Sequence, residues 1–119
     1  MPISVAAAPE DEVRQAFDRF VAAQNAHDAK AVGEILLPSS EFLWITRGTA
    51  VWGSDAALKR FAALYEGTWL LEPDASSMKV RLLTADVAQL FVPVIFTIGA
   101  AGQPPQRTRF LLNQILTKT

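Results

Sequence analysis

Two tryptophans and an arginine lie close together between Phe42 and Gly53, where they could form part of a ligand site. The segment reads F-L-W-I-T-R-G-T-A-V-W-G and contains Trp44, Arg47 and Trp52. Indole rings bury large apolar surfaces and carry one N–H donor, which suits the wall of a pocket. Arg47 could lie at the entrance of this pocket. The alternative is that it is a solvated arginine in an exposed turn. The segment has no carboxylate and no histidine, so it offers a wall without a catalytic base.

A second set of polar side chains lies near the C-terminus of the chain. Arg109, Leu111 and Asn113 share one face of an expected strand, because side chains alternate along a strand with period two. If this face points inwards, the arginine and the asparagine could bind a carboxylate or carbonyl group of a ligand. An internal ion pair between Arg109 and a glutamate of the same domain is the alternative.

Three residues are candidates for acid–base chemistry, namely Tyr65, Glu72 and His27. Each also has a structural explanation. Tyr65 continues the apolar stripe of a helix, Glu72 precedes Pro73 in an expected loop, and a histidine at a helix C-terminus is favoured by the helix dipole. Because the chain has one histidine and no cysteine, we expect no metal site, no disulfide and no cofactor.

Length and composition indicate one small globular domain. The chain has 119 residues, of which 50% are hydrophobic and 19% are charged. A net charge of −1 does not favour binding to nucleic acid or to an anionic membrane surface, and no apolar segment is long enough to span a membrane. Residues 1–9 are expected to form a flexible arm. A cytoplasmic location is favoured, with a trimmed export signal ending near Ala8 as the alternative.

The spacing of apolar residues, together with the residues that cap or end helices and strands, predicts helices followed by strands. The first half is expected to contain helices at 10–26, 29–37 and 54–66, capped by Asp28 and Ser54 and ended by Gly67, with a hairpin at 42–46 and 50–52. The second half is expected to contain strands at 68–72, 78–83, 87–98 and 107–118.

The strand predicted at 87–98 carries apolar residues on both faces. Val87, Phe91 and Ile95 alternate with a second apolar set that includes Val92 and Phe96. Helices can cover one face, so we expect a second copy of the chain to cover the other, giving a homodimer. Pro93 cannot donate a hydrogen bond and therefore predicts a bulge or an unpaired stretch in this strand.

This order of elements and three of its segments resemble the NTF2-like superfamily, which includes the SnoaL-like, DUF4440 and ketosteroid-isomerase-like domains. The segments are V-R-Q-A-F-D-R-F-V-A-A-Q-N-A-H-D-A-K-A-V, W-G-S-D-A-A-L-K-R-F and T-R-F-L-L-N-Q-I-L-T-K. The resemblance implies an α+β, cystatin-like cone over residues 10–119, with three N-terminal helices packed on a curved antiparallel sheet. Such domains usually end with one more strand, which does not appear before Thr119. Either the sequence given stops short of this strand, or the sheet has an open edge that a neighbouring chain covers.

The resemblance also places the family's catalytic positions in this chain. The positions of the ketosteroid-isomerase-like tyrosine, base and acid correspond to Phe20, Ile45 or Thr46, and Leu111. In the limonene-epoxide-hydrolase-like pattern Arg109 matches the arginine, but Leu111 replaces the aspartate. The usual carboxylates of both mechanisms are thus replaced.

We therefore expect a homodimeric NTF2-like domain that binds a small, mostly apolar ligand such as an aromatic acid. The alternatives are an isomerase, cyclase or hydrolase with a nonstandard site, and a structural dimerisation module. The expected ligand-binding residues are Phe20, Trp44, Trp52, Phe61, Tyr65, Trp69, Arg109, Leu111 and Asn113.

Overall fold

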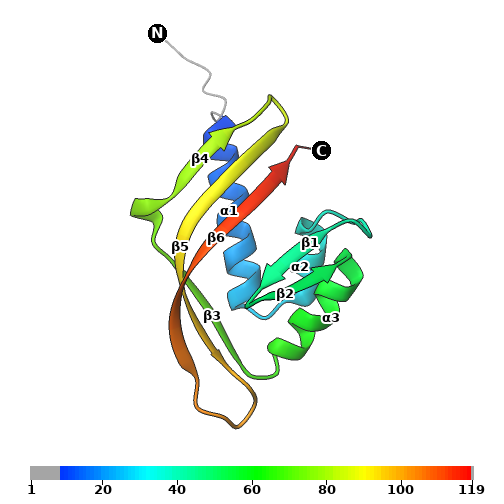
Figure 1. Ribbon diagram of the computed structural model, residues 1–119, viewed down its shortest axis with the longest axis vertical. Helices are drawn as coiled ribbons and strands as arrows, with labels where there is room; N and C mark the ends of the chain where they lie inside the picture. The colour runs from blue at the N-terminus through cyan, green and yellow to red at the C-terminus, as the bar shows by residue number, and fades with distance from the viewer. Residues whose placement is uncertain (1–8, 119) are drawn as a thin grey trace.

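The computed structural model describes residues 9–118, which form three α-helices and two antiparallel sheets (Figure 1). The expected N-terminal arm lies outside the described residues apart from Pro9, which begins the first helix. No helix within residues 9–118 has the length and apolar character needed to cross a membrane.

The first two helices lie next to each other in the chain and begin with favourable charges. Helix α1 spans Pro9–Asn25, and its acidic first turn suits the positive end of the helix dipole. Helix α2 spans Ala29–Ile35, and the Asp28 side chain accepts a hydrogen bond from the Ala31 N–H at 3.0 Å. The predicted cap at Asp28 is thus confirmed.

The third helix differs from its prediction at both ends. Helix α3 spans Ser54–Leu64, so Ser54 is its first residue and Gly53, with φ of 90°, takes the N-cap position. At the other end, Gly67 does not have a positive φ typical of a helix cap. A Cβ atom at Gly67 would instead collide with the carbonyl oxygen of Gly99, so glycine is needed there for close backbone approach.

The segment around the two tryptophans forms a separate two-stranded hairpin. Strand β1 spans Leu43–Thr46 and pairs with β2, Thr49–Trp52. Arg47 and Gly48 form the two-residue turn, with φ of 46° and 79°. Positive φ at both positions matches the turn type that follows the natural twist of a hairpin. The predicted hairpin is confirmed, and its turn fixes the position of Arg47.

The larger sheet has a long central strand. Strand β5, Val87–Gly99, pairs along one side with β6, Gln106–Thr117. Its other side pairs with β3, Thr68–Pro73, and then with β4, Lys79–Leu82. A short 3₁₀ turn, Ala75–Ser77, connects β3 to β4.

Pro93 lies where β5 passes from one neighbour to the next. The β3 ladder ends at Val94 and the β4 ladder begins at Phe91. The Pro93 carbonyl accepts the Asp74 N–H at 2.9 Å, so the side of Pro93 that lacks a donor faces this gap between the two strands. The predicted unpaired stretch is confirmed on this side of β5, whereas on the other side Pro93 pairs with Leu111 of β6.

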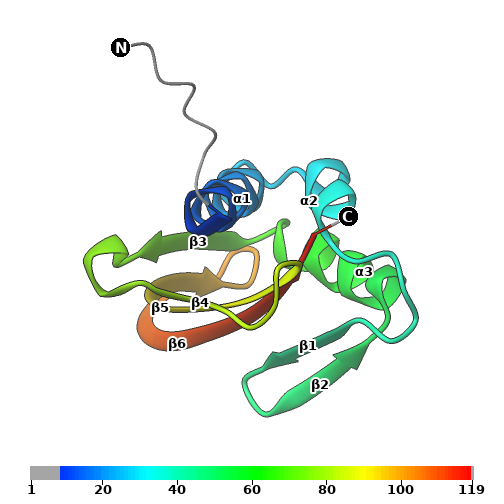
Figure 2. The ribbon, with the colours of Figure 1, turned by 90° about the horizontal axis from the view of Figure 1, so that it is seen from above.

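The helices cover one face of the four-stranded sheet (Figure 2). Residues of β5 with even numbers face the helices, and Leu90, Val92 and Val94 are at most 1% exposed. They pack with Phe17 and Val32 of the helices in the main core. The odd-numbered residues form the opposite face, away from the helices, where Phe91 and Ile95 are half-buried and Pro93 is buried. The predicted α+β architecture, with three helices on an antiparallel sheet, is confirmed.

Candidate ligand-binding cleft

A cleft of about 180 Å³ separates the hairpin from the large sheet. Its lining comes from four elements: Trp44–Arg47 of the hairpin, Trp69 of β3, Phe96 and Ile98 of β5, and Phe110–Leu112 of β6. The hairpin and the large sheet share no backbone pairing within the described residues. The cleft is therefore a space between two sheets.

Aromatic rings form a continuous wall on the inner side of the cleft. Trp44 stacks on Phe61 of α3 with ring centres 4.2 Å apart, and Phe61 meets the edge of Trp69 at 6.2 Å. Trp69 contacts Phe96 at 5.5 Å, and Phe96 contacts Phe110 at 5.3 Å, both nearly perpendicular. Offset and edge-to-face pairs of this kind stabilise one another beyond the area they bury.

A buried glutamine fixes part of this wall from behind. Gln24 of α1 is completely buried, and its Oε1 accepts hydrogen bonds from Trp69 Nε1 at 2.9 Å and from the Tyr65 hydroxyl at 2.5 Å. The two bonds hold the Trp69 indole in one orientation. The Nε2 group of Gln24 has no hydrogen-bond partner among the described residues. The sequence places Gln24 on the apolar stripe of its helix, but that position alone gave no sign of a role at the site.

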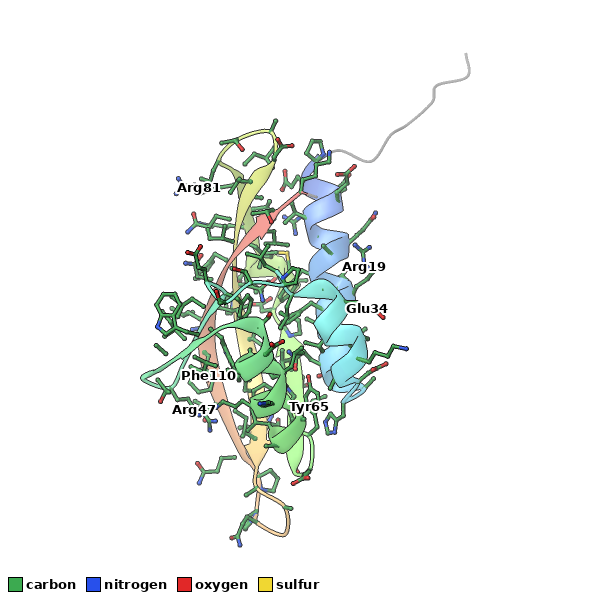
Figure 3. The ribbon with its side chains drawn as sticks, turned by 90° about the vertical axis from the view of Figure 1, so that its right-hand side faces the viewer. Arg19, Glu34, Arg47, Tyr65, Arg81 and Phe110 are labelled. Atoms are coloured by element: carbon green, nitrogen blue, oxygen red, sulfur yellow. The ribbon has the colours of Figure 1, made fainter. Side chains whose placement is uncertain are left out.

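Arg47 supplies the positive charge of the cleft. It is the only titratable residue in the lining, and no ion pair within residues 9–118 involves it. Figure 3 shows Arg47 and Phe110 on one side of the molecule and Arg19 and Glu34 on the other. A second cation, Arg60 of α3, lies 5.8 Å from the ring centre of Trp44. An anionic group in the cleft would thus meet a guanidinium without a competing carboxylate in the lining.

The structure brings five of the expected ligand-binding residues to the cleft or its wall. Trp44, Trp69 and Leu111 line the cleft directly. Phe61 is 4% exposed and supports Trp44 from behind, while Tyr65 stacks against Phe61 with ring centres 6.1 Å apart.

The other four expected residues lie elsewhere. Phe20 packs against the core, and Trp52 is 60% exposed on the hairpin. Arg109 and Asn113 are exposed, so the expectation that their face of β6 points inwards is corrected. The register pairs Phe110 and Leu112 with the buried Val94 and Val92, and period-two alternation then directs Arg109, Leu111 and Asn113 to the opposite face. Leu111 lines the cleft although it lies on that opposite face and is 63% exposed.

The three candidate catalytic residues do not line the cleft. Burial, with a smaller contribution from the negative charge of Asp28, raises the pKa of Tyr65 to about 12, so its hydroxyl stays protonated at neutral pH. His27 follows α1 and has a φ of 56°. Its ring stacks on that of Tyr65 with ring centres 5.0 Å apart, and its Nε2 atom is hydrogen-bonded to the Trp69 carbonyl oxygen at 2.8 Å.

Glu72 lies in strand β3, as the strand predicted at 68–72 implies, and the alternative of a loop around Pro73 is wrong. It is exposed on the face away from the helices, and its carboxylate lies 3.6 Å from the Arg107 guanidinium. No group of three or more histidine, aspartate or glutamate side chains in residues 9–118 is arranged to hold a metal ion.

Several solved structures share this arrangement of helices and strands. An NTF2-like superfamily protein from Salmonella enterica aligns with a TM-score of 0.79 at 17% identity, covering 92% of this chain and 80% of that one. An NTF2-like protein of unknown function from Shewanella oneidensis aligns with a TM-score of 0.75 at 15% identity, covering 94% and 89%. A protein with a cystatin-like fold from Caulobacter vibrioides aligns with a TM-score of 0.75 at 16% identity, covering 92% and 78%.

These likenesses define the fold of the chain. The protein has an NTF2-like fold, as the sequence resemblance implied. Neither a protein-family model nor a curated protein sequence matches the chain.

Proposed function

We propose that the protein binds a small, single-ring, mostly apolar molecule with one anionic group in the cleft between the hairpin and β6. The cleft of about 180 Å³ is close to the size of an engineered apolar cavity of roughly 150 Å³ that holds benzene. An aromatic wall supplies contact area for the ring, and Arg47 supplies a partner for a carboxylate.

The observation that carries this proposal is the composition of the lining. It contains four aromatic residues and one arginine, and it contains no carboxylate, histidine or tyrosine. Ile45 and Thr46, where the sequence resemblance would place an isomerase-like base, are both in the lining. Proton transfer needs a titratable group within hydrogen-bond reach of the substrate. The lining therefore favours binding over the alternative of an isomerase-like or SnoaL-like enzyme.

The proposal can be tested by following tryptophan fluorescence during titration with benzoate and with benzamide, which has the same shape and no charge. We expect saturable binding of benzoate and weaker binding of benzamide. Replacing Arg47 with glutamine should weaken benzoate binding by about tenfold, the effect of losing one charge-assisted contact.

The matched control is Arg81→Gln, because Arg81 is an exposed arginine of β4 far from the cleft (Figure 3). It should bind benzoate like the unchanged protein. Equal affinity of the Arg47→Gln variant and the control would contradict the proposal.

We also propose that two copies associate through the outer face of the large sheet. Leu111, Ile115 and Leu70 on this face are 63%, 58% and 39% exposed, and Phe91 and Ile95 lie half-buried between them. Polar residues such as Gln89, Arg109 and Asn113 lie on the same face, and exposed apolar groups bordered by polar residues mark interaction sites in soluble proteins. A two-fold axis would place the same patch of each copy against the other.

A further inference from the structure

The strands of the large sheet carry five charged side chains on their outer face, and four of the five are positive. The pairing register and period-two alternation place on this face Glu72, Lys79, Arg81, Arg107 and Arg109. All five are exposed. Two copies that associate through this face must keep these cations apart, because like charges directly opposite each other destabilise a contact.

The single carboxylate of these strands lies in a row of residues that ends in an arginine. Strands β3 and β4 run along one side of β5, and β6 runs along the other (Figure 1). Glu72 of β3 and Arg109 of β6 both pair with Ile95, so they lie at the two ends of one row across the sheet. Within residues 9–118, Glu72 has one ion-pair contact, an exposed one with Arg107 at 3.6 Å. The carboxylate is therefore open to a further cation.

A lysine occupies the corresponding row on the other side of Pro93. Glu72 lies in the row of Ile95, two residues along β5 from Pro93. Lys79 lies in the row of Phe91, two residues from Pro93 in the opposite direction. Because β3 and β4 lie on the same side of β5, Glu72 and Lys79 flank the central row of Pro93 at equal distances.

Two-fold symmetry can bring these positions together between two copies. Sheets that pack face to face with aligned strands cross at about 30°, so the two-fold axis in the plane of contact runs close to the strand direction or close to its perpendicular. Through Pro93, an axis along the strands places Glu72 opposite Arg109 of the second copy. An axis across the strands places Glu72 opposite Lys79 of the second copy.

Either of these axes also separates the remaining cations. Each of them then faces an uncharged residue of the second copy, namely Leu70, Asn113 or Ile115. Packing with perpendicular strands needs a diagonal axis, which places Lys79 and Arg109 opposite each other or opposite their own counterparts. The charges therefore favour aligned packing of the two sheets.

An exposed leucine of β6 decides between the two axes. Leu111 is 63% exposed and pairs with Pro93. The axis across the strands places the Leu111 side chains of the two copies against each other and Phe91 against Ile95. The axis along the strands places Leu111 opposite the side of Pro93 that has no strand partner. Burial of apolar surface therefore favours the axis across the strands.

From this arrangement we propose that Glu72 forms an ion pair with Lys79 of the second copy and that this pair fixes the orientation of the two copies. The inference rests on the proposed association through the outer face and names the charged contact that orients it. In a two-fold contact each pair of residues occurs twice, so a change of Glu72 removes two ion pairs from each dimer.

Charge reversal tests this ion pair. The dissociation constant of the dimer is measured by sedimentation equilibrium for the unchanged protein, for Glu72→Lys and for the control Glu34→Lys. The control makes the same change of charge at an exposed residue of α2, on the helical side of the sheet. We expect Glu72→Lys to weaken the dimer at least about tenfold and the control to change it by less than about twofold, with equal circular dichroism spectra.

Two double variants identify the partner cation. Glu72→Lys combined with Lys79→Glu exchanges the two charges and should restore the dissociation constant to within about threefold of the unchanged protein. Glu72→Lys combined with Arg109→Glu should remain weak, because Lys79 of the second copy still meets a positive charge. Recovery in the Arg109 combination alone would overturn the assignment of Lys79.

A dimer that Glu72→Lys leaves unchanged would overturn the inference while the proposed association through the outer face stands. An unchanged protein that is monomeric at every concentration would contradict the association itself, and the inference with it. The two failures are thus distinguished before any double variant is measured.

Discussion

At the scale of single residues, the wall of the cleft depends on a polar contact inside the core. Gln24 is fully buried on a helix face that otherwise carries apolar residues, and it accepts the indole and phenol donors of Trp69 and Tyr65. A buried polar group is stabilising only when it is paired. Here the two pairs also set the orientation of an aromatic ring that lines the cleft.

Tyr65 should show this environment in its titration. The chain contains one tyrosine, so tyrosinate absorbance in the ultraviolet reports on Tyr65 alone. We expect a pKa of about 12 in the folded protein and a return towards 10.0 in urea, because burial disfavours the charged form. A folded-state pKa close to that in urea would contradict the buried contact with Gln24.

The same pKa shift sets a direction for stability at high pH. The folded-state pKa lies above the unfolded value, so the contribution of Tyr65 is fully present below about pH 10 and is lost as the pH rises towards 12. Urea unfolding at a series of alkaline pH values should therefore show a smaller loss of stability in Tyr65→Phe than in the unchanged protein. Equal losses in the two proteins would show that Tyr65 does not titrate in this way.

At the scale of elements, side chains at the end of α1 fix the helix against the edge of β3. The Asn25 side chain donates to the Leu71 carbonyl at 2.9 Å and accepts the Leu71 N–H at 2.8 Å. It thus replaces a neighbouring strand at this point of the β3 edge. His27 adds a bond to the Trp69 carbonyl, so both residues attach the helix to the strand that carries Trp69.

Removing the Asn25 side chain should therefore destabilise the fold. We expect Asn25→Ala to lower the free energy of unfolding by about 1–3 kcal/mol, because it leaves a backbone donor and acceptor without partners. The control is Asn113→Ala, an exposed position where we expect a change within about 0.5 kcal/mol. Equal stability of the two variants in urea unfolding would contradict the role given to Asn25.

The sequence predicted the elements better than it predicted the site. The apolar spacing at residues 13–24 predicted helix α1, and Pro93 predicted the gap in the sheet. Both predictions succeeded because they depend only on the residues of the segment itself. The inward face of β6 was missed, because Phe110 and Leu112 on one face and Leu111 and Ile115 on the other are equally apolar. Only pairing with β5, a contact between distant segments, decides which set is buried. Phe96 and Phe110 could have been assigned to the cleft only if the pairing register of β5 and β6 had been known.

At the scale of the whole molecule, the exposed apolar residues on the outer face of the large sheet are the strongest argument for association. We expect a dimer in native mass spectrometry and a monomer for Phe91→Glu, because the substitution places a charge in the middle of this face. The control Leu37→Glu makes the same kind of change at a residue that follows α2 and is 48% exposed. A Phe91→Glu variant that remains dimeric would contradict association through this face. Phe96→Glu is unsuitable for this test, because Phe96 packs against the core.

The central claim is that the cleft between the hairpin and β6 binds an aromatic acid. The most direct measurement is a crystal structure of the protein with 4-bromobenzoate, whose bromine gives an anomalous signal. We expect the ring in contact with Trp44 or Phe110 and the carboxylate within ion-pair distance of Arg47. Bromobenzoate bound only outside this cleft, or a cleft without ligand at saturating concentration, would contradict it.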